Sequence, residues 1–351
     1  MLTRIEIDGF KSFLDFELAV SPFLALVGPN SSGKSNLLDA LGFARAALLA
    51  RGPGLSASND PLLEARRGKP QELFHRPVGS DSVSRFTIGV EADMRASDGR
   101  DKAYASVTAS REPADWALTA VPGWSDKIWP QEARSWHFHR PDLAAIRKPV
   151  TALDRRPLAE DCANLAAVLG RMSLTGELGD LMVDLVALLP DVTGVRPVLD
   201  ERQQEWSFEI LVDREPMPVG HASDGTLRVL ALLVALYDRT FSGPLMVEEI
   251  ENGLYPSRLG ELLRRIAQRV GAIGSPWQQV ILTSHSPVVV STLYRTAPES
   301  LVFLEAAWRA GGGKPRSRVT LAKPVRAEGE PGTFTSPRQV RSYLSAVGQA
   351  A

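Results

Sequence analysis

A glycine-containing loop between an apolar run and a helical pattern limits the folds open to this chain more than any other feature. The apolar run FLALV ends at Gly28, which predicts a buried strand. Apolar residues then recur at helical spacing from Ser35 to Ala50, so a helix follows the loop. The loop and the first helical residues are Gly28, Pro29, Asn30, Ser31, Ser32, Gly33, Lys34 and Ser35. This order of strand, loop and helix is typical of α/β proteins that bind phosphate groups.

Each residue type in the loop suits a part in phosphate binding. Gly28 and Gly33 let the backbone curl so that its N–H groups face an anion, and the following helix adds the positive end of its dipole. Lys34 is expected to reach the β- and γ-phosphates of a nucleotide, and the Ser35 hydroxyl is expected to bind Mg²⁺. Asn36 follows directly and is placed in the same nucleotide site. A glycine-rich turn that binds nothing is the competing interpretation, and the flanking strand and helix disfavour it.

Two adjacent carboxylates, Glu248 and Glu249, follow a second apolar strand at 245–247. One carboxylate can hold a magnesium ion, usually through water, while the next can polarise an attacking water. Taken alone, two acids in this place are equally typical of a solvated strand end. In a chain with a phosphate-binding loop, they favour a metal and water site.

Two further segments place polar groups at the end of a regular element. Ser223 precedes the helical run at 227–239 and predicts an N-cap, which is also all that the simplest interpretation requires. The same helix end leaves free N–H groups that attract an anion. His285 follows an apolar strand at 280–284. A lone histidine is usually structural or superficial, but its position after a strand, downstream of the acidic pair, favours a functional role.

Composition narrows the class of protein. The 351 residues suggest one large domain with an insertion, or two modest domains. Hydrophobic residues make up 44% and charged residues 23%, with a net charge of −1, which excludes a largely disordered chain and argues against a uniformly basic coat. The single Cys162 excludes an intrachain disulfide and favours a cytoplasmic location. The longest apolar stretch, 229–237, is far short of the ~20 residues of a membrane span.

The middle of the chain predicts β structure followed by helices. Alternating segments at 84–96, 102–111 and 115–124 predict an antiparallel meander. Helical patterns follow at 163–174 and 176–190, strands at 196–201 and 205–214, and the GGGK segment at 311–314 predicts a hairpin.

The order of these segments resembles the ABC-type ATPases. The stretches IEIDGFKSF, GPNSSGKSNLLDAL, SDGTLR and EEIENGLYP look more like the RecF, SMC and OLD group than like transporter subunits. The resemblance implies an α/β P-loop fold whose core sheet comes from both chain ends, with an antiparallel β and helical region inserted. It divides the chain into residues 1–60 and 216–351, which form the ATPase core, and residues 61–215, which form the insertion. A long coiled-coil arm and a TOPRIM nuclease domain are not expected, because too little chain is left for either.

The resemblance also implies roles for single residues. Ser223 and Gly225 fall on the signature motif that binds the nucleotide of a second protomer. Glu248 falls on the acid beside Mg²⁺, Glu249 on the catalytic glutamate and His285 on the switch histidine. Residues 252–254 match the loop that crosses the dimer interface. ATP and Mg²⁺ are therefore the expected ligands, and ATP binding is expected to form a homodimer.

Several residues depart from the pattern or have simpler interpretations. Glu248 stands where the family usually has Asp, so hydrolysis is expected to be slow. Gln71 is only a weak match to the glutamine loop. His137 and His139 alternate in WHFHRP, and a surface strand is favoured over a metal site. The densest basic cluster consists of Arg66, Arg67, Lys69 and Arg76. For this cluster a solvated loop is favoured over contact with nucleic acid.

Three functions remain open from the sequence. The first is a cytoplasmic ATPase whose dimerisation acts on DNA or on an effector protein such as a nuclease, as in DNA repair or anti-phage defence. The second is a regulatory module that holds ATP with negligible turnover and docks a partner protein. The third is the energising subunit of a transporter, which the N-terminal block and the signature disfavour.

Overall fold

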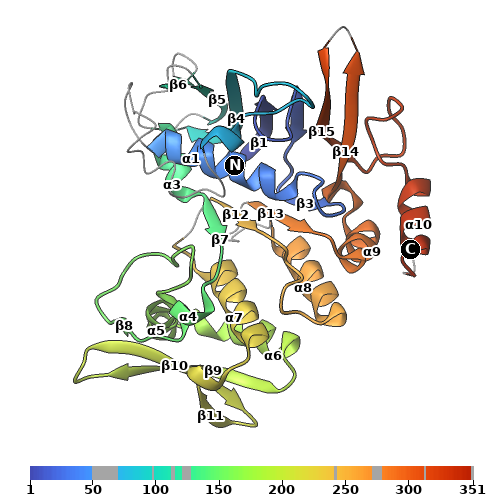
Figure 1. The fold of residues 1–351 in the computed structure, drawn as a ribbon. Coiled ribbons are helices and arrows are strands. Elements are labelled where there is room, and N and C mark those ends of the chain that lie inside the picture. Colours follow the sequence, from blue (N-terminus) through green and yellow to red (C-terminus); the bar gives the residue numbers. More distant parts are fainter. Residues whose placement is uncertain are drawn as a thin grey trace. The chain divides into compact units, whose positions relative to one another are not determined.

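The computed structural model describes residues 1–49, 70–96, 99–111, 115–120, 128–240, 243–270, 279–311 and 314–348 (Figure 1). The chain divides into two compact units, which are described in turn. The first comprises Met1–Trp136 and Gln279–Ala351, and the second comprises His137–Gln278. This division by contacts differs from the predicted division into an ATPase core and an insertion, which stays a prediction.

The first unit contains a sheet that begins with the N-terminal strands. Its order is β2-β1-β4-β5-β6, and all neighbouring strands described pair antiparallel. The strands are β1 Leu2–Asp8, β2 Phe16–Ala19, β4 Arg85–Ala96, β5 Gly99–Ser110 and β6 Asp115–Ala120. The predicted meander is therefore confirmed over the described residues, and it extends the sheet that the first two strands begin. Residues 121–124 of its third predicted segment lie outside the described residues.

A second group of strands in the first unit surrounds β3 (Phe23–Val27), whose five residues are all buried. β13 (Gln279–Ser284) and β14 (Leu301–Gly311) flank β3, and both run parallel to it. β15 (Lys314–Pro324) then pairs antiparallel with β14, which confirms the predicted hairpin. Sheet strands thus come from both ends of the chain, as the resemblance implied.

Helices and short turns complete the first unit. They are α1 Lys34–Leu49, η1 Pro70–Leu73, α3 Ile128–Ser135, α9 Pro287–Thr296, η3 Pro298–Ser300 and α10 Pro337–Ala346. Helix α1 packs against the meander sheet through aromatic side chains. The Phe43 ring lies 5.1 Å from that of Phe86 and 6.3 Å from that of Phe10, in edge-to-face geometry. Such pairs stabilise a core beyond the area they bury and fix the helix that follows the glycine loop.

The second unit combines helices with short sheets. Its helices and turns are α4 Leu143–Ile146, α5 Leu165–Thr175, α6 Leu178–Leu188, η2 Val219–His221, α7 Asp224–Tyr237 and α8 Pro256–Arg269. Its strands are β7 His137–His139, β8 Val150–Thr151, β9 Val192–Asp200, β10 Glu205–Val212, β11 Glu215–Pro218 and β12 Pro244–Val247. β10 pairs antiparallel with β8, β9 and β11, while β12 runs parallel to β7. The helices and strands predicted between 163 and 214 are confirmed.

Candidate functional site

The glycine loop connects β3 to α1 in the first unit and is tightly curled. Gly28, Ser31 and Gly33 all have positive φ angles, of +155°, +61° and +105°. A Cβ atom added to Gly28 would lie 2.3 Å from the carbonyl oxygen of Leu304, and one added to Gly33 would lie 2.2 Å from Oγ1 of Thr320. Both glycines are therefore required by conformation and by contact with the β14–β15 hairpin.

Lys34 lies across the inside of this loop. Its side chain is largely buried, and Nζ donates to the carbonyl oxygens of Gly28 (2.7 Å) and Pro29 (2.9 Å). The N–H of Leu37 bonds to the carbonyl of Gly33, so the N–H groups of residues 34–36 lie ahead of the helical ladder. Backbone donors, a helix N-terminus and an ammonium group thus meet at one loop, which suits an anion.

Side chains from distant parts of the chain hold the loop in place. Thr320 Oγ1 lies 3.0 Å from the carbonyl oxygen of Ser32 and 2.8 Å from the hydroxyl of Ser12. Asn36 donates to the same Ser12 hydroxyl at 2.9 Å. Sequence reasoning missed Thr320 because a single threonine on a strand has no local pattern. Ser12 was visible only as part of GFKSF.

A second link joins the GFKSF segment to α1. Lys11 Nζ lies 2.6 Å from Oδ2 of Asp39, and both side chains are mostly buried. The backbone N–H of Lys11 donates to the carbonyl of Leu73, and Nδ1 of His75 lies 2.7 Å from the carbonyl of Lys11. Gln71 is exposed in η1 just before this contact, so the weak glutamine-loop candidate lies in a segment tied to GFKSF.

The predicted switch histidine lies at the same strand edge as the glycine loop. Ser284 of β13 is paired with Val27 of β3, and His285 and Gly28 are the next residues on each strand. The His285 side chain is exposed. Because the two strands are parallel, their carboxyl ends meet at one edge, where α/β proteins bind ligands.

The second unit contains the segment predicted to be the signature motif. Ser223 caps α7, with its side chain accepting from the N–H of Thr226 at 3.1 Å, as predicted. Asp224 would repel an anion at this helix end, but Arg147 Nη2 lies 2.8 Å from its carboxylate and offsets the charge. A Cβ atom on Gly225 would lie 2.9 Å from the carbonyl oxygen of Gly253. The signature helix therefore meets the loop after β12 backbone to backbone.

The acidic pair lies directly after buried strand β12. Glu248 and Glu249 are both half-buried, and Glu249 has a φ of +50°. This left-handed backbone is unfavourable for a residue with a side chain, and such conformations cluster at functional sites. The Asn252 side chain donates to Glu249 Oε2 at 2.9 Å, and its N–H donates to the Glu249 carbonyl at the same distance. A tight turn thus sets the direction of the carboxylate.

An open cavity of about 710 Å³ lies beside the signature helix within the second unit. Its lining includes Ser223, Gly225 and Thr226 from the helix end and Gly253, Leu254 and Tyr255 from the following loop. The Tyr255 side chain is 81% exposed. The cavity therefore joins the predicted signature residues to the loop predicted to cross a dimer interface.

The chain matches one protein family over residues 23–157 and 187–291. The family is described as an AAA domain, putative AbiEii toxin, of a type IV toxin–antitoxin system. The match covers more than half of the chain. The chain belongs to this family.

Solved structures similar to this AAA family member include SMC head domains. The head with a coiled coil and joint from Pyrococcus yayanosii aligns with a TM-score of 0.62 at 10% identity and covers 99% of each chain. An SMC head bound to the C-winged helix domain of ScpA aligns with a TM-score of 0.59 at 15% identity, over 92% of this chain and 97% of that one. The head from Thermotoga maritima gives 0.54 at 14% identity, over 93% and 99%. This AAA family member therefore has the SMC-head fold, which confirms the predicted ABC-type P-loop architecture.

The residues of the AAA family member fit a nucleotide with Mg²⁺. The Ser32 hydroxyl is buried in the loop and has no hydrogen-bond partner within the described part of the chain. An unsatisfied buried hydroxyl beside curled backbone N–H groups is a donor set for phosphate oxygens. Ser35 and the carboxylate of Glu248 are oxygen ligands of the kind Mg²⁺ prefers.

The two histidines of WHFHRP correct the sequence interpretation. His137 and His139 are only 4% and 6% exposed in β7, so the predicted surface strand is wrong. Burial, with the nearby charges of His137 and Arg228, lowers the pKa of His139 to about 3. Cys162 Sγ lies 3.8 Å from His139 Nδ1, and burial raises the pKa of that thiol. No group of three metal-ligating side chains is found among the described residues.

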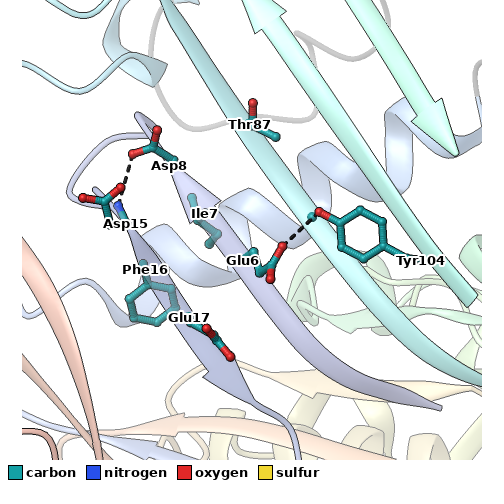
Figure 2. A pocket seen from close by; sticks show the side chains of 9 residues that line it. Glu6, Ile7, Asp8, Asp15, Phe16, Glu17, Thr87 and Tyr104 are labelled. Atoms are coloured by element: carbon teal, nitrogen blue, oxygen red, sulfur yellow. Dashed lines mark hydrogen bonds between the residues drawn. The ribbon is translucent and has the colours of Figure 1, made fainter. Parts of the chain in front are cut away.

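A smaller cavity of about 320 Å³ opens on the meander sheet (Figure 2). Glu6, Asp8, Asp15 and Glu17 line it, and Tyr104 donates to Glu6 at 2.9 Å. Burial and this hydrogen bond raise the pKa of Tyr104. The acidic lining disfavours phosphate, and none of the predicted nucleotide residues lies in it.

Two further predictions concerned the basic cluster around Arg66 and the lack of a membrane span. Arg66, Arg67 and Lys69 lie outside the described residues, and Arg76 is exposed. Within the described ranges, each helix is too short or too polar to cross a bilayer.

Proposed function

We propose that the protein is an ABC-type ATPase that binds and hydrolyses ATP with Mg²⁺, and that ATP binding closes a homodimer. The observation that supports this best is the curled loop of Gly28–Gly33 with Lys34 lying across it. Membership of the AAA family and the SMC-head fold add weight to it.

In this proposal the chain's residues divide the work between two copies. The glycine loop and the start of α1 hold the phosphates in one protomer, through Gly28, Pro29, Asn30, Ser31, Ser32, Gly33, Lys34, Ser35 and Asn36. Ser35 and Glu248 hold Mg²⁺, which neutralises phosphate charge when bound. Glu249 accepts a proton from the attacking water. His285 lies beside the phosphates, at the strand edge that it shares with the glycine loop. Ser223 and Gly225 of the second protomer present the N-terminus of α7 to the same phosphates.

The exposure of the signature segment supports a composite site. Ser223 is exposed, and an exposed helix end with its acidic neighbour neutralised by Arg147 is suited to an anion from another molecule. An open cavity of about 710 Å³ lies next to this helix end. Hydrolysis would cleave the γ-phosphate, and its release would remove the charge shared by the two protomers, so the dimer would open and close with the nucleotide.

Steady-state phosphate release tests the enzymatic part. The wild type should release phosphate from ATP, and Glu249→Gln should abolish release while ATP still binds. Lys34→Ala should lose ATP binding in calorimetry, because the ammonium supplies charge to the phosphates. Unchanged ATP affinity of Lys34→Ala would contradict the assignment of the site.

A regulatory module with negligible turnover is the second candidate. It is favoured by Glu248 in the position of an aspartate and by the Glu249 carboxylate, which already accepts from Asn252. Tight ATP binding by the wild type without phosphate release would select it over the ATPase.

The downstream role is proposed to be a switch on DNA or on an effector protein such as a nuclease, in DNA repair or anti-phage defence in the cytoplasm. The SMC head in one similar structure binds the C-winged helix domain of ScpA, so a protein partner is the closer analogy. A pull-down with Glu249→Gln and ATP, examined for both DNA and protein, distinguishes the two. DNA binding through the basic cluster around Arg66 should weaken steeply as salt rises.

A further inference from the structure

The β14–β15 hairpin brings Arg318, which has no part in the proposed function so far, to the glycine loop. Residues at alternating positions of a strand point to one face, so Arg318 lies on the same face of β15 as Thr320. Thr320 bonds to the carbonyl of Ser32, and Arg318 Nη2 lies 3.5 Å from the carbonyl oxygen of Ser31. Two neighbouring side chains of β15 therefore contact two consecutive peptide groups of the loop.

Arg318 differs from the other described cations of the hairpin in its partners. Arg309 is paired with Asp15 at 2.8 Å, and Lys323 with Glu305 at 2.5 Å. The Arg316 guanidinium stacks over the Trp308 ring at 4.1 Å. Arg318 is exposed, and within the described residues its one polar contact is the long bond to Ser31. A contact at 3.5 Å is at the weak limit of a hydrogen bond.

This arrangement is better suited to an incoming anion than to support of the loop. Thr320 bonds the Ser32 carbonyl at 3.0 Å, whereas Arg318 reaches the Ser31 carbonyl only at 3.5 Å and keeps a full charge with four further N–H donors. A guanidinium binds phosphate in two-pronged fashion and stays charged at all working pH values. Because the side chain is held so weakly, it can turn toward phosphate oxygens at little cost.

We propose that Arg318 is a phosphate-contacting residue of the nucleotide site, supplied in cis by the β14–β15 hairpin. The proposal rests on the proposed function, since it names a further ligand of the same nucleotide. Arg318 adds to Lys34 a second positive charge, from the outer wall of the loop. The hairpin then has a direct part in nucleotide affinity as well as in holding the loop.

Calorimetry of Mg²⁺–ADP and Mg²⁺–ATP binding tests the proposal with three variants. Arg318→Ala should weaken binding about tenfold, which is the effect expected of one charge-assisted contact to phosphate. Arg318→Gln keeps an N–H donor for the Ser31 carbonyl but lacks the charge, so it should weaken binding as much as Arg318→Ala. Arg318→Lys keeps the charge and should retain most of the affinity.

Arg316→Ala is the matched control, because Arg316 is two residues away on the same strand face and stacks on Trp308. It should change nucleotide affinity by less than about twofold. Wild-type affinity in Arg318→Ala, or in Arg318→Gln alone, would overturn the proposal, the latter by showing that Arg318 only supports the loop. If the wild type itself binds neither nucleotide, the proposed function fails instead. Melting temperatures of all variants exclude unfolding as the cause.

Discussion

Thr320 makes two hydrogen-bond contacts that hold the glycine loop in its conformation. Its hydroxyl links the carbonyl of Ser32 to the hydroxyl of Ser12, and its side chain fills the space that a Cβ of Gly33 would need. This buried hydroxyl group is therefore one of the contacts that fix the shape of the loop. Gly33 can adopt the positive φ angle that the loop needs, and the contact with Thr320 stabilises the loop in that conformation.

Replacing Thr320 by valine keeps the volume and removes the hydroxyl. Thr320→Val should lower the free energy of unfolding by about 1 to 3 kcal/mol, because the Ser32 carbonyl loses the Thr320 hydroxyl and the Ser12 hydroxyl keeps only Asn36 as a partner. ATP affinity should fall with it. Urea unfolding and calorimetry measure the two effects. Thr335→Val is the control, since Thr335 is also buried but bonds the Lys323 carbonyl only at 3.5 Å. Equal losses in both variants would contradict the assigned role.

His139 makes the stability of the second unit depend on pH. Its pKa falls from an ordinary 6.5 to about 3 on folding, so the unfolded chain binds a proton that the folded chain does not. The neutral histidine is favourable above pH 6.5, and stability is lost as pH falls toward 3. Between pH 7 and pH 5 this one group should cost about 2 kcal/mol. His139→Gln should lose correspondingly less over that interval in urea unfolding. A pH dependence identical to that of the wild type would refute this origin.

At the scale of elements, the contact between α7 and the loop after β12 couples the signature to the acidic pair within the second unit. Gly225 and Gly253 touch through their backbones, and Asn252, beside Gly253, holds Glu249. A shift of the helix end therefore moves the turn that directs the carboxylate. The coupling needs small residues on both elements.

Two glycines at the second position of their helices separate helix propensity from this contact. Gly179 in α6 has open space around its missing side chain, so Gly179→Ala should stabilise the protein by up to about 0.5 kcal/mol, less than in a helix interior. Gly225→Ala should instead destabilise it by about 1 to 3 kcal/mol, because the methyl group meets the Gly253 carbonyl. Thermal unfolding of the two variants gives the comparison. Melting temperatures that move in the same direction would contradict the claim that the contact with Gly253 excludes a side chain at position 225.

Sequence patterns predicted the elements with short-range signals. The strand, loop and helix around Gly28–Gly33 and the cap at Ser223 depend on residues a few positions apart, and the structure confirms them. The burial of His139 was mispredicted, because alternation on a three-residue strand does not reveal that both faces are covered. The Lys11–Asp39 pair and the contact of Thr320 were not predictable for another reason. Each requires knowing which distant segments pack together.

At the scale of the whole molecule, the proposed cycle requires two copies of the chain. Glu249→Gln with ATP should accumulate dimers, because the phosphates that join the protomers would persist. Light scattering with and without ATP measures the mass. The double variant Lys34→Ala, Glu249→Gln is the control and should remain monomeric. Monomers alone in the single variant, at ATP concentrations that saturate binding, would contradict the composite site.

The contact between the hairpin and the glycine loop can form only late in the synthesis of the chain. Thr320 follows Ser32 by 288 positions, so a ribosome working at about 5 to 20 residues per second delivers it roughly 15 to 60 s later. Until then the nascent loop lacks the side chain that shapes it. If the loop binds a nucleotide as proposed, chains that have not yet reached β15 should therefore bind it more weakly than the finished chain.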